Sequence, residues 1–438
     1  PRHDGDMMQA ISANRRQVLG GLVTLAAATP TLAHAQGALD ATMLSVTGDS
    51  GENQAVALQA ALDQAADAGQ VLRLPAGVIL VTGLEFPGNL VVEGVPGRTE
   101  IRTMADGQGL LVNDRGSLVL RNIGFAAGTA ALTITASDII ALERCRFRNA
   151  GIGVAITDAD VTIRDCSFTE LSDAAVHAMD SRGLHITGNR IDHCGNAGIR
   201  IWRSQSGPDG SIVTANHIAN IDWRGGGNGQ NGNGLNIFRA DEVIVADNHI
   251  ADCAFTAVRL NATNNSQVSG NTCLRSGEVA IFSEFAFSGS VIANNIVDTA
   301  ATGISITNLD SGGQLAVCSG NIVRNITPAS AVNPDTIPIG IFAEAETAIT
   351  GNSVQNVPGV AIAAGYGPFL RNVLISANVV SDSTIGIGVS VVDGAGAVHI
   401  GDNAVSARDH AIVGLAWSDV VEPDLVANAG RYDNVTIR

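Results

Sequence analysis

The chain contains no lysine, so all 25 of its basic residues are arginines. This absence excludes Schiff-base catalysis and P-loop nucleotide chemistry, because both need a lysine amine. With 42 acidic residues, the formal net charge is −17. A protein this acidic gains no electrostatic affinity for nucleic acids or for anionic lipids, so neither is expected as a partner.

Aromatic residues are also scarce. They make up 4% of the chain, whereas apolar residues reach 45% and there are 50 glycines. The core must therefore consist of thin aliphatic layers joined by frequent turns. After residue 75 no ten-residue stretch keeps a helical period without a Gly or Asn interruption, which argues against a βα barrel.

The first 35 residues have the pattern of an export signal. The segment NRRQVL at 14–19 leads into an apolar stretch at 18–28, and Ala-His-Ala at 33–35 fits the small-residue rule for cleavage. The stretch is too short to span a bilayer. It resembles a twin-arginine signal, which implies the twin-arginine export machinery as a partner, a periplasmic or secreted protein beginning near Gln36, and no stable membrane insertion after cleavage. The alternative is an amphipathic core helix.

A short phrase recurs from residue 118 onward: an apolar strand followed by Asn, any residue and an apolar residue. Successive copies are 21 to 32 residues apart when the following positions are taken as equivalent: Asn122, Cys145, Cys166, Asn189, Asn216, Asn248, Asn271, Asn294, Asn321, Asn352, Asn378 and Asn403. We expect Asn at this corner to adopt left-handed backbone angles and to hydrogen-bond both the backbone and the Asn of the next coil.

A second phrase, small-Ile-x-apolar, keeps the same register, as at Gly198–Ile201 and Gly303–Ile306. Each coil thus has at least two short strands that bury their apolar face only by stacking. A propeller would need about forty residues per blade, and leucine-rich repeats need fixed leucines. The pattern predicts an all-β fold, a single-stranded right-handed parallel β-helix of roughly 12 coils.

The cysteines follow the same repeat. Cys145 and Cys166 occupy the corner slot of adjacent coils, where small buried residues are expected and a disulfide is the alternative. Cys194 and Cys253 lie two coils apart and cannot pair.

The start of the repeat region resembles the entry of the pectin-lyase-like superfamily. Residues 55–70 (AVALQAALDQAADAGQ) have helical spacing, and Leu74-Pro75-Ala76-Gly77 matches the superfamily's LPxGxY-type strand, with Val78 in place of its aromatic residue. The resemblance implies a helix that caps the first coil. Together with the signal and the repeats, nearly the whole chain is similar to a family of twin-arginine-exported repetitive β-helix proteins. We therefore expect a signal peptide at 1–35 and a β-helix domain at 36–438, with a capping helix at about 53–68, coils at about 90–415 and a C-terminal cap at 416–438.

Outward residues of one strand position form columns, with one residue per coil at about 4.8 Å intervals. One predicted column is His177, Arg200, Asn236, Arg259, Phe282, Ser305 and Phe342. The next is Met179, Trp202, Phe238, Asn261, Glu284, Thr307 and Glu344. Arginines mixed with aromatics suit an acidic polysaccharide, because sugar rings stack on aromatic faces and arginines pair with uronate carboxylates. The expected substrate-binding residues are Trp202, Arg203, Asn236, Phe238, Arg239 and Asn261.

The candidate catalytic residues are His177, Arg200, Arg259, Glu284 and Glu344. In a lyase, Arg200 or Arg259 would neutralise the substrate carboxylate, with His177 or the other arginine near the departing proton. In a hydrolase, Glu284 and Glu344, two coils or about 9.6 Å apart, would suit inversion. The aspartate cluster of polygalacturonases and the Asp-Pro-His-Asp motif of mannuronan epimerases are absent.

The longest repeat step contains the segment GGGNGQNGNG at 225–234, which is expected to wall this face. We interpret that segment as a flexible loop; a single calcium-binding nonapeptide is the alternative, and no metal or other cofactor is expected. Solvated arginines that pair with neighbouring acids are the alternative for the whole face. Two functions remain open: a polysaccharide lyase or hydrolase, and a non-catalytic glycan-binding or structural envelope protein.

Overall fold

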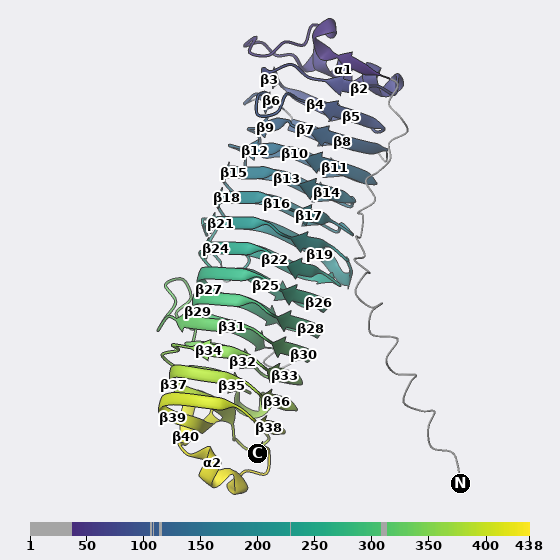
Figure 1. The fold of residues 1–438 in the computed structure, drawn as a ribbon. Helices are drawn as coiled ribbons and strands as arrows, with labels where there is room; N and C mark the ends of the chain where they lie inside the picture. Colours follow the sequence, from purple (N-terminus) through teal and green to yellow (C-terminus); the bar gives the residue numbers. More distant parts are fainter. Residues whose placement is uncertain (1–36, 106, 108, 114–115, 228, 308–312) are drawn as a thin grey trace, which may run out of the picture. The chain divides into compact units, whose positions relative to one another are not determined.

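The computed structural model describes residues 37–438 except 106, 108, 114–115, 228 and 308–312. The predicted signal at 1–35 lies outside the described residues. The chain winds into a right-handed parallel β-solenoid of about 14 turns with a short helix at its N-terminal end (Figure 1). The predicted fold class is confirmed, and the prediction of roughly 12 coils is slightly low.

Each turn contributes to a 16-stranded sheet and to a 25-stranded sheet that has two arms. The 16-stranded sheet contains β1 (Ala38–Asp40), β2 (Val71–Arg73), β5 (Leu90–Glu93), β8 (Ser117–Arg121), β11 (Ile139–Glu143), β14 (Val161–Arg164), β17 (His185–Thr187), β20 (Ile212–Thr214), β23 (Ile244–Ala246), β26 (Asn264–Ser269), β28 (Ser288–Ala293), β30 (Gln314–Ser319), β33 (Thr347–Thr350), β36 (Val373–Ser376), β38 (Val398–Gly401) and β41 (Val435–Ile437).

The first arm of the 25-stranded sheet contains β3 (Gly77–Val81), β6 (Thr99–Thr103), β9 (Gly124–Ala126), β12 (Arg146–Arg148), β15 (Ser167–Leu171), β18 (Arg190–Cys194), β21 (His217–Ile221), β24 (His249–Cys253), β31 (Ile322–Ile326) and β34 (Ser353–Gln355). The second arm contains β4 (Gly83–Phe86), β7 (Gly109–Val112), β10 (Ala130–Thr135), β13 (Ile152–Thr157), β16 (Ala174–Met179), β19 (Ala197–Pro208), β22 (Asn233–Asp241), β25 (Val258–Asn261), β32 (Ile339–Ala343) and β35 (Val360–Ala364). Four long strands run through both arms: β27 (Thr272–Glu284), β29 (Ile296–Thr307), β37 (Val379–Ser390) and β39 (Ala404–Ala416).

The corner between the 16-stranded sheet and the first arm holds a continuous ladder of buried asparagines. Asn248, for example, donates from Nδ2 to Oδ1 of Asn271 at 2.9 Å and to the carbonyl of Val213 at 3.0 Å. The backbone N–H of Asn248 donates to the same Oδ1 of Asn271 at 3.0 Å. These bonds recur through Asn189, Asn216, Asn248, Asn271, Asn295, Asn321, Asn352, Asn378 and Asn403. The predicted bonding of the corner asparagines is confirmed.

Three details of the predicted corner are wrong. The ladder residue of its coil is Asn295, not Asn294, and the corner position of the first repeat is the buried Ile123, not Asn122. The left-handed residue is the one before each ladder position, such as Asn294 with φ of 57°. The ladder asparagines themselves have no positive φ.

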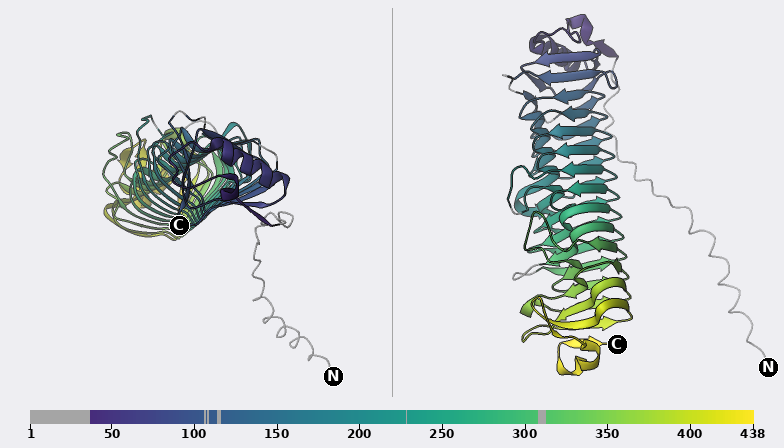
Figure 2. Two further views of the ribbon diagram at one scale, coloured as in Figure 1. Left: turned by 90° about the horizontal axis from the view of Figure 1, so that it is seen from above. Right: turned by 90° about the vertical axis from the view of Figure 1, so that its left-hand side faces the viewer.

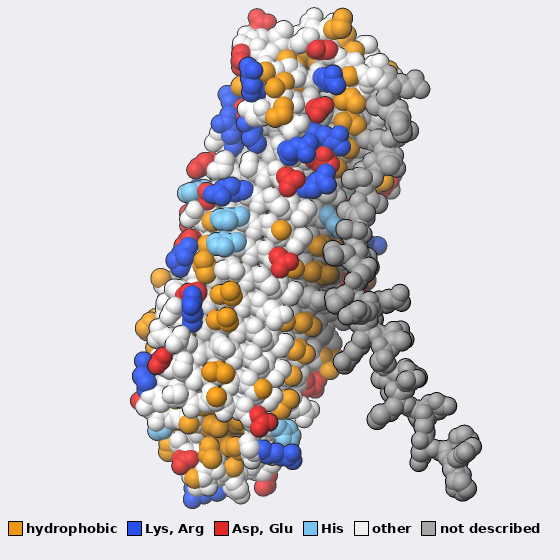
Figure 3. Space-filling model, viewed as in Figure 1, with side chains coloured by type: hydrophobic (Ala, Val, Ile, Leu, Met, Phe, Trp, Pro, Cys, Tyr) orange, Lys and Arg blue, Asp and Glu red, His pale blue; other side chains and the backbone are white. Residues whose placement is uncertain are grey.

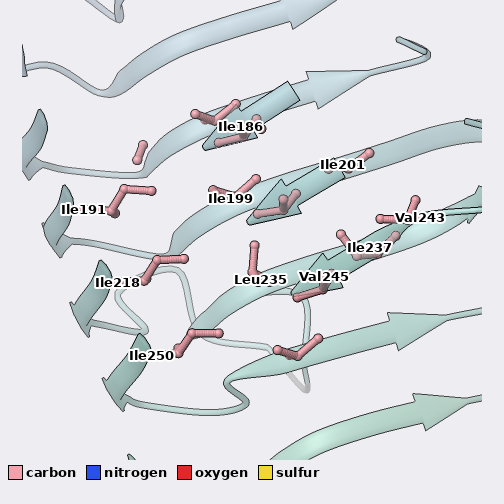
Figure 4. Close-up of a cluster of buried hydrophobic side chains, with 14 of the residues drawn as sticks. Ile186, Ile191, Ile199, Ile201, Ile218, Leu235, Ile237, Val243, Val245 and Ile250 are labelled. Atoms are coloured by element: carbon pink, nitrogen blue, oxygen red, sulfur yellow. The ribbon is translucent and has the colours of Figure 1, made fainter. Parts of the chain in front are cut away.

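The interior is filled by aliphatic residues that stack on their counterparts in the next coil. Ile191, Ile218 and Ile250 form one such column, and Ile199 and Leu235 belong to another (Figure 4). The small residue that opens each second-arm strand has a steric cause: a Cβ on Gly198 would lie 2.4 Å from the carbonyl oxygen of Gly234. Close contact of successive coils therefore selects the small-Ile-x-apolar phrase.

Both ends of the stack are covered. At the N-terminal end, helix α1 (Ala55–Asp67) buries Leu58, Ala61, Leu62 and Ala65, which confirms the predicted helix. At the other end β40 (Asp419–Glu422) pairs antiparallel with β39, and helix α2 (Leu425–Asn428) follows it. Three short 3-10 helices complete the elements: η1 (Ala41–Leu44), η2 (Gly367–Phe369) and η3 (Ala429–Arg431). None of the described helices is long and apolar enough to cross a membrane.

All six cysteines are buried free thiols. The backbone N–H of Cys145 donates to Sγ of Cys166 at 3.3 Å, so the thiol takes the acceptor role that an Asn oxygen has elsewhere in the ladder. Burial raises the pKa of Cys194, Cys273 and Cys318 to about 12, which makes their thiols poor nucleophiles.

We predict that Asn271→Ala lowers the free energy of unfolding by about 2–4 kcal/mol, because the lost amide leaves buried ladder groups without partners at about 1–3 kcal/mol each. Chemical denaturation followed by circular dichroism measures the effect. Asn294→Gly is the matched control: it removes an exposed amide at a left-handed position and should cost less than about 0.5 kcal/mol. Equal losses in the two variants would contradict a structural role for the ladder.

Candidate functional site

The outward side of the second arm, which we call the second-arm face, carries the two predicted columns. Strand register pairs His177 with Arg200, Arg200 with Asn236 and Asn236 with Arg259, and continues to Phe342. The second column is in register from Met179 to Thr307. Sequence periodicity therefore placed these side chains on one face.

The glycine-rich segment between β21 and β22 folds over this face. Gly232 N–H donates to the carbonyl of Asn196 at 2.6 Å, and the amide of Asn233 donates to the carbonyl of Gly229 at 2.7 Å. Gly229 has φ of 125°, and a Cβ there would lie 2.2 Å from Nη1 of Arg259. The loop thus lies against the guanidinium of Arg259, with Gly229 in a backbone conformation that residues with a Cβ rarely adopt.

Beneath the loop, Arg200 is held by three partners. It is 4% exposed and its guanidinium binds the carboxylate of Asp173 at 3.1 Å and Oδ1 of Asn231 at 2.9 Å. A third guanidinium contact, with Nδ1 of His177, is at 3.4 Å. A substrate carboxylate could reach this guanidinium only by displacing Asp173 or the loop.

Arg259 is buried between two carboxylates. It is 7% exposed, binds Glu284 through two nitrogens at 2.7 and 2.9 Å, and donates from Nη1 to Glu278 at 3.2 Å. Asn261 donates to the same Glu284 at 2.8 Å. The predicted catalytic residues Arg259 and Glu284 are therefore partners of each other.

The remaining predicted residues have mixed environments. Arg203 and Arg239 donate to the carbonyls of Ser181 and Ser204 at 3.1 and 2.9 Å. Arg239 also lies over the ring of Phe238 at 4.7 Å. Glu344 is only 1% exposed, so it does not present a carboxylate to solvent.

Five of the predicted residues come together around one cavity of about 280 Å³, which we call the Trp202 hollow. It is lined by Trp202, Gly229, Gln230, Asn236, Phe238, Arg259, Asn261 and Phe285. Trp202 is half-buried, donates from Nε1 to Asn236 at 3.2 Å, and lies at 6.3 Å from the Phe238 ring with a T-shaped geometry. His177, Arg200, Glu284 and Glu344 are not among its lining residues.

A second cavity of about 350 Å³, the Trp417 groove, continues the face toward the C-terminal end. It is lined by Glu278, Val279, Phe282, Thr302, Ser305, Thr307, Asn333, Asp335, Thr336, Ile337, Ile339, Phe342, Val360, Ala363, Gly365, Tyr366, Leu415, Trp417 and Ser418. Tyr366 and Trp417 lie ring to edge at 4.9 Å, and Trp417 is 47% exposed.

Sequence reasoning missed the Trp417 groove. Phe282 and Phe342 were placed in a column but were not selected as site residues, and Tyr366 and Trp417 lie in turns beyond the repeated phrase. One signal was available: the step from Asn321 to Asn352 is the second longest, at 31 residues, and its extra residues contribute to the wall of this groove. The wall is fixed by hydrogen bonds from Asn333 to Glu278 at 2.8 Å and from Thr302 to the carbonyl of Ile337 at 2.6 Å.

The two cavities adjoin across an ion pair, since Arg259 lines the Trp202 hollow, Glu278 lines the Trp417 groove, and the two are bonded at 3.2 Å. In residues 37–438, apart from the gaps given above, no three His, Cys, Asp or Glu side chains are grouped to hold a metal ion.

Comparison with known proteins identifies the class of fold. Residues 108–227 match a family model described as a right-handed β-helix region, and a search of curated proteins finds no match. Among solved structures, the catalytic unit of a GH87 α-1,3-glucanase from Streptomyces thermodiastaticus strain HF3-3 is similar at 12% identity, with 87% of this chain and 69% of that chain covered and a TM-score of 0.51.

Two further solved structures cover most of this chain. An N-terminal fragment of bacteriophage phi29 gene product 12 matches at 14% identity over 91% of this chain and 65% of that chain, with a TM-score of 0.50. A mannuronic acid specific family 6 polysaccharide lyase from human gut microbiota matches at 14% identity over 90% of this chain and 93% of that chain, with a TM-score of 0.47. At these identities the likeness to the glucanase and to the phage protein shows the fold alone.

The environment of His177 leads to a pH prediction. Burial, followed by the nearby Arg200 guanidinium, lowers the pKa of His177 below its usual 6.5, while Asp173 raises it. We expect NMR titration of the imidazole to give a midpoint below 6.5, with Asp173→Asn lowering it further. The unfolded chain binds this proton more readily than the folded one, so the stability contributed by neutral His177 is present above pH 6.5 and is lost as the pH falls below it. A midpoint above 6.5 would contradict the assigned environment.

Proposed function

We propose that the protein binds a polysaccharide chain along the second-arm face. The observation that carries this proposal is a row of aromatic side chains that follows the solenoid axis through both cavities: Trp202, Phe238, Phe282, Phe342, Tyr366 and Trp417. In a chain with only 4% aromatics, this concentration on one face favours a binding role.

The dimensions suit a linear ligand. From Trp202 to Trp417 the row crosses about eight coils, or roughly 38 Å at 4.8 Å per coil. Sugar rings stack on aromatic side chains, and the polar groups between the rings offer hydrogen bonds to hydroxyls. The α-1,3-glucanase supports this proposal as an example of a protein with this fold that acts on a glycan.

Export is part of the proposal. Residues 1–35 have the twin-arginine pattern, and extracellular or periplasmic space is where a glycan-binding solenoid would meet polysaccharides. We therefore propose that the protein is periplasmic or secreted.

Cleavage of an acidic glycan by β-elimination is the second candidate function, and His177 favours it. Its lowered pKa leaves the imidazole neutral at pH 7 and able to accept a proton beside the guanidinium of Arg200. This reaction requires the Arg200 guanidinium to break its ion pair with Asp173 and to pair with the substrate carboxylate instead. Binding without turnover needs no such rearrangement, so the geometry supports binding best.

We predict that Trp417→Ala weakens glycan binding about three- to tenfold, because one stacking contact contributes about 0.5–1.5 kcal/mol. Titration calorimetry with a panel of neutral and uronate oligosaccharides measures the loss. Leu374→Ala is the control, since Leu374 is a 42%-exposed side chain on β36 in the other sheet. If no glycan binds, or if both variants weaken binding equally, the face is not the binding site.

Catalysis is tested separately by turnover. Incubation with uronate polysaccharides should raise the absorbance of unsaturated products if the lyase reading is right, and His177→Ala should abolish the signal. New reducing ends without unsaturation, lost in Glu284→Gln, would indicate hydrolysis. If binding depends on Trp417 but neither unsaturated products nor new reducing ends form, the protein is a non-catalytic glycan-binding protein.

A further inference from the structure

The Trp417 groove carries charge of one sign. Among its described lining residues, Glu278 and Asp335 are the charged ones, and both are acids. The groove is otherwise aliphatic, hydroxylic and aromatic, with Phe282, Phe342, Tyr366 and Trp417 in its walls. Uronate carboxylates would find no arginine there to pair with. The predicted arginines belong to the other half of the face, beyond the Arg259–Glu278 pair.

The buried cluster behind the groove adds to this charge. Arg259 supplies one positive charge to two carboxylates, those of Glu278 and Glu284. The other described partners of the carboxylates are neutral donors: Thr256 and Asn333 bind Glu278, and Asn261 binds Glu284. The formal charge of the cluster, counted as two carboxylates and one guanidinium, is therefore −1, in a site where low polarity strengthens electrostatic interactions.

The two acidic groups of the groove differ in depth: Glu278 is buried and paired with Arg259 at 3.2 Å, whereas Asp335 is exposed. Asn333 fixes the 327–338 segment to Glu278 at 2.8 Å, and Oδ1 of Asn333 in turn accepts the backbone N–H of Asp335 at 3.2 Å. Ser330 adds a bond to the carbonyl of Gly277 at 2.6 Å. The exposed Asp335 carboxylate thus stands at the rim of a groove whose walls are aromatic rings.

Aromatic faces and carboxylates together recognise ammonium groups, since a cation gains from both the ring quadrupole and the negative charge. We infer that the Trp417 groove selects a glycan built from amino sugars that carry a free ammonium group, in preference to an N-acetylated or uronate chain. This inference rests on the proposed glycan-binding function and specifies the substrate class of that site.

The test compares two ligands that differ only at nitrogen: a tetramer of 2-amino-2-deoxyglucose and its fully N-acetylated counterpart. At a pH where the amines are protonated, the amino tetramer should bind at least about tenfold more tightly by calorimetry. Asp335→Asn should reduce that preference about threefold or more while leaving the affinity for the N-acetylated tetramer unchanged. Asp67→Asn, at the end of α1, removes the same charge elsewhere and should have no effect.

The outcomes separate the two levels of the proposal. Equal or tighter binding of the N-acetylated tetramer, lost in Trp417→Ala, would overturn the amino-sugar inference and leave the glycan-binding function standing. Binding of the amino tetramer that survives Trp417→Ala unchanged would also overturn the inference, because the contact would then be non-specific attraction to an acidic protein. If neither tetramer nor any other glycan binds, both proposals fail.

Discussion

Contact between successive coils is the constraint on which the rest of the structure depends. A single turn has only three short strands and buries nothing by itself, so backbone hydrogen bonds, aliphatic columns and the asparagine ladder all run from one coil to the next. The ladder fixes the register, because each Asn bonds a backbone N–H and a backbone carbonyl of the preceding coil, as Asn248 does with the N–H of Asn216 and the carbonyl of Val213. A residue's position within its coil therefore determines which residues flank it along the whole stack.

This register also explains why the arginines of the second-arm face are paired. Side chains in an outward column stand about 4.8 Å apart, a distance at which like charges would repel strongly under a covering loop. Asn236 separates Arg200 from Arg259 in the column. Arg200 pairs with Asp173, and Arg259 pairs with Glu278 and Glu284. A buried guanidinium that lost its carboxylate would be costly, so these pairs stabilise the covered face.

The sequence predicts what the repeat determines and does not predict the contacts made by residues outside the repeat. The fold, the helix α1 and the membership of both outward columns were predictable, because period and pattern determine them. The error at Asn294 arose where two asparagines adjoin and only the inward amide belongs to the ladder. The pairing of Arg259 with Glu278 was not predictable, because Glu278 lies outside the repeated phrase. It is located where the register of β27 shifts, between Ser276 and Val279.

The Trp417 groove was missed for a physical reason that bears on function. A perfect repeat produces a smooth face, and the Trp417 groove forms where coils depart from the repeat, at the long segment before β32 and at the turns that hold Tyr366 and Trp417. Trp417 can lie over the chain because Gly367 has no Cβ, which would otherwise lie 2.5 Å from the ring. In a solenoid the regular positions specify the fold, and the irregular ones, whose structure depends on contacts between non-equivalent residues, shape the surface that a ligand meets.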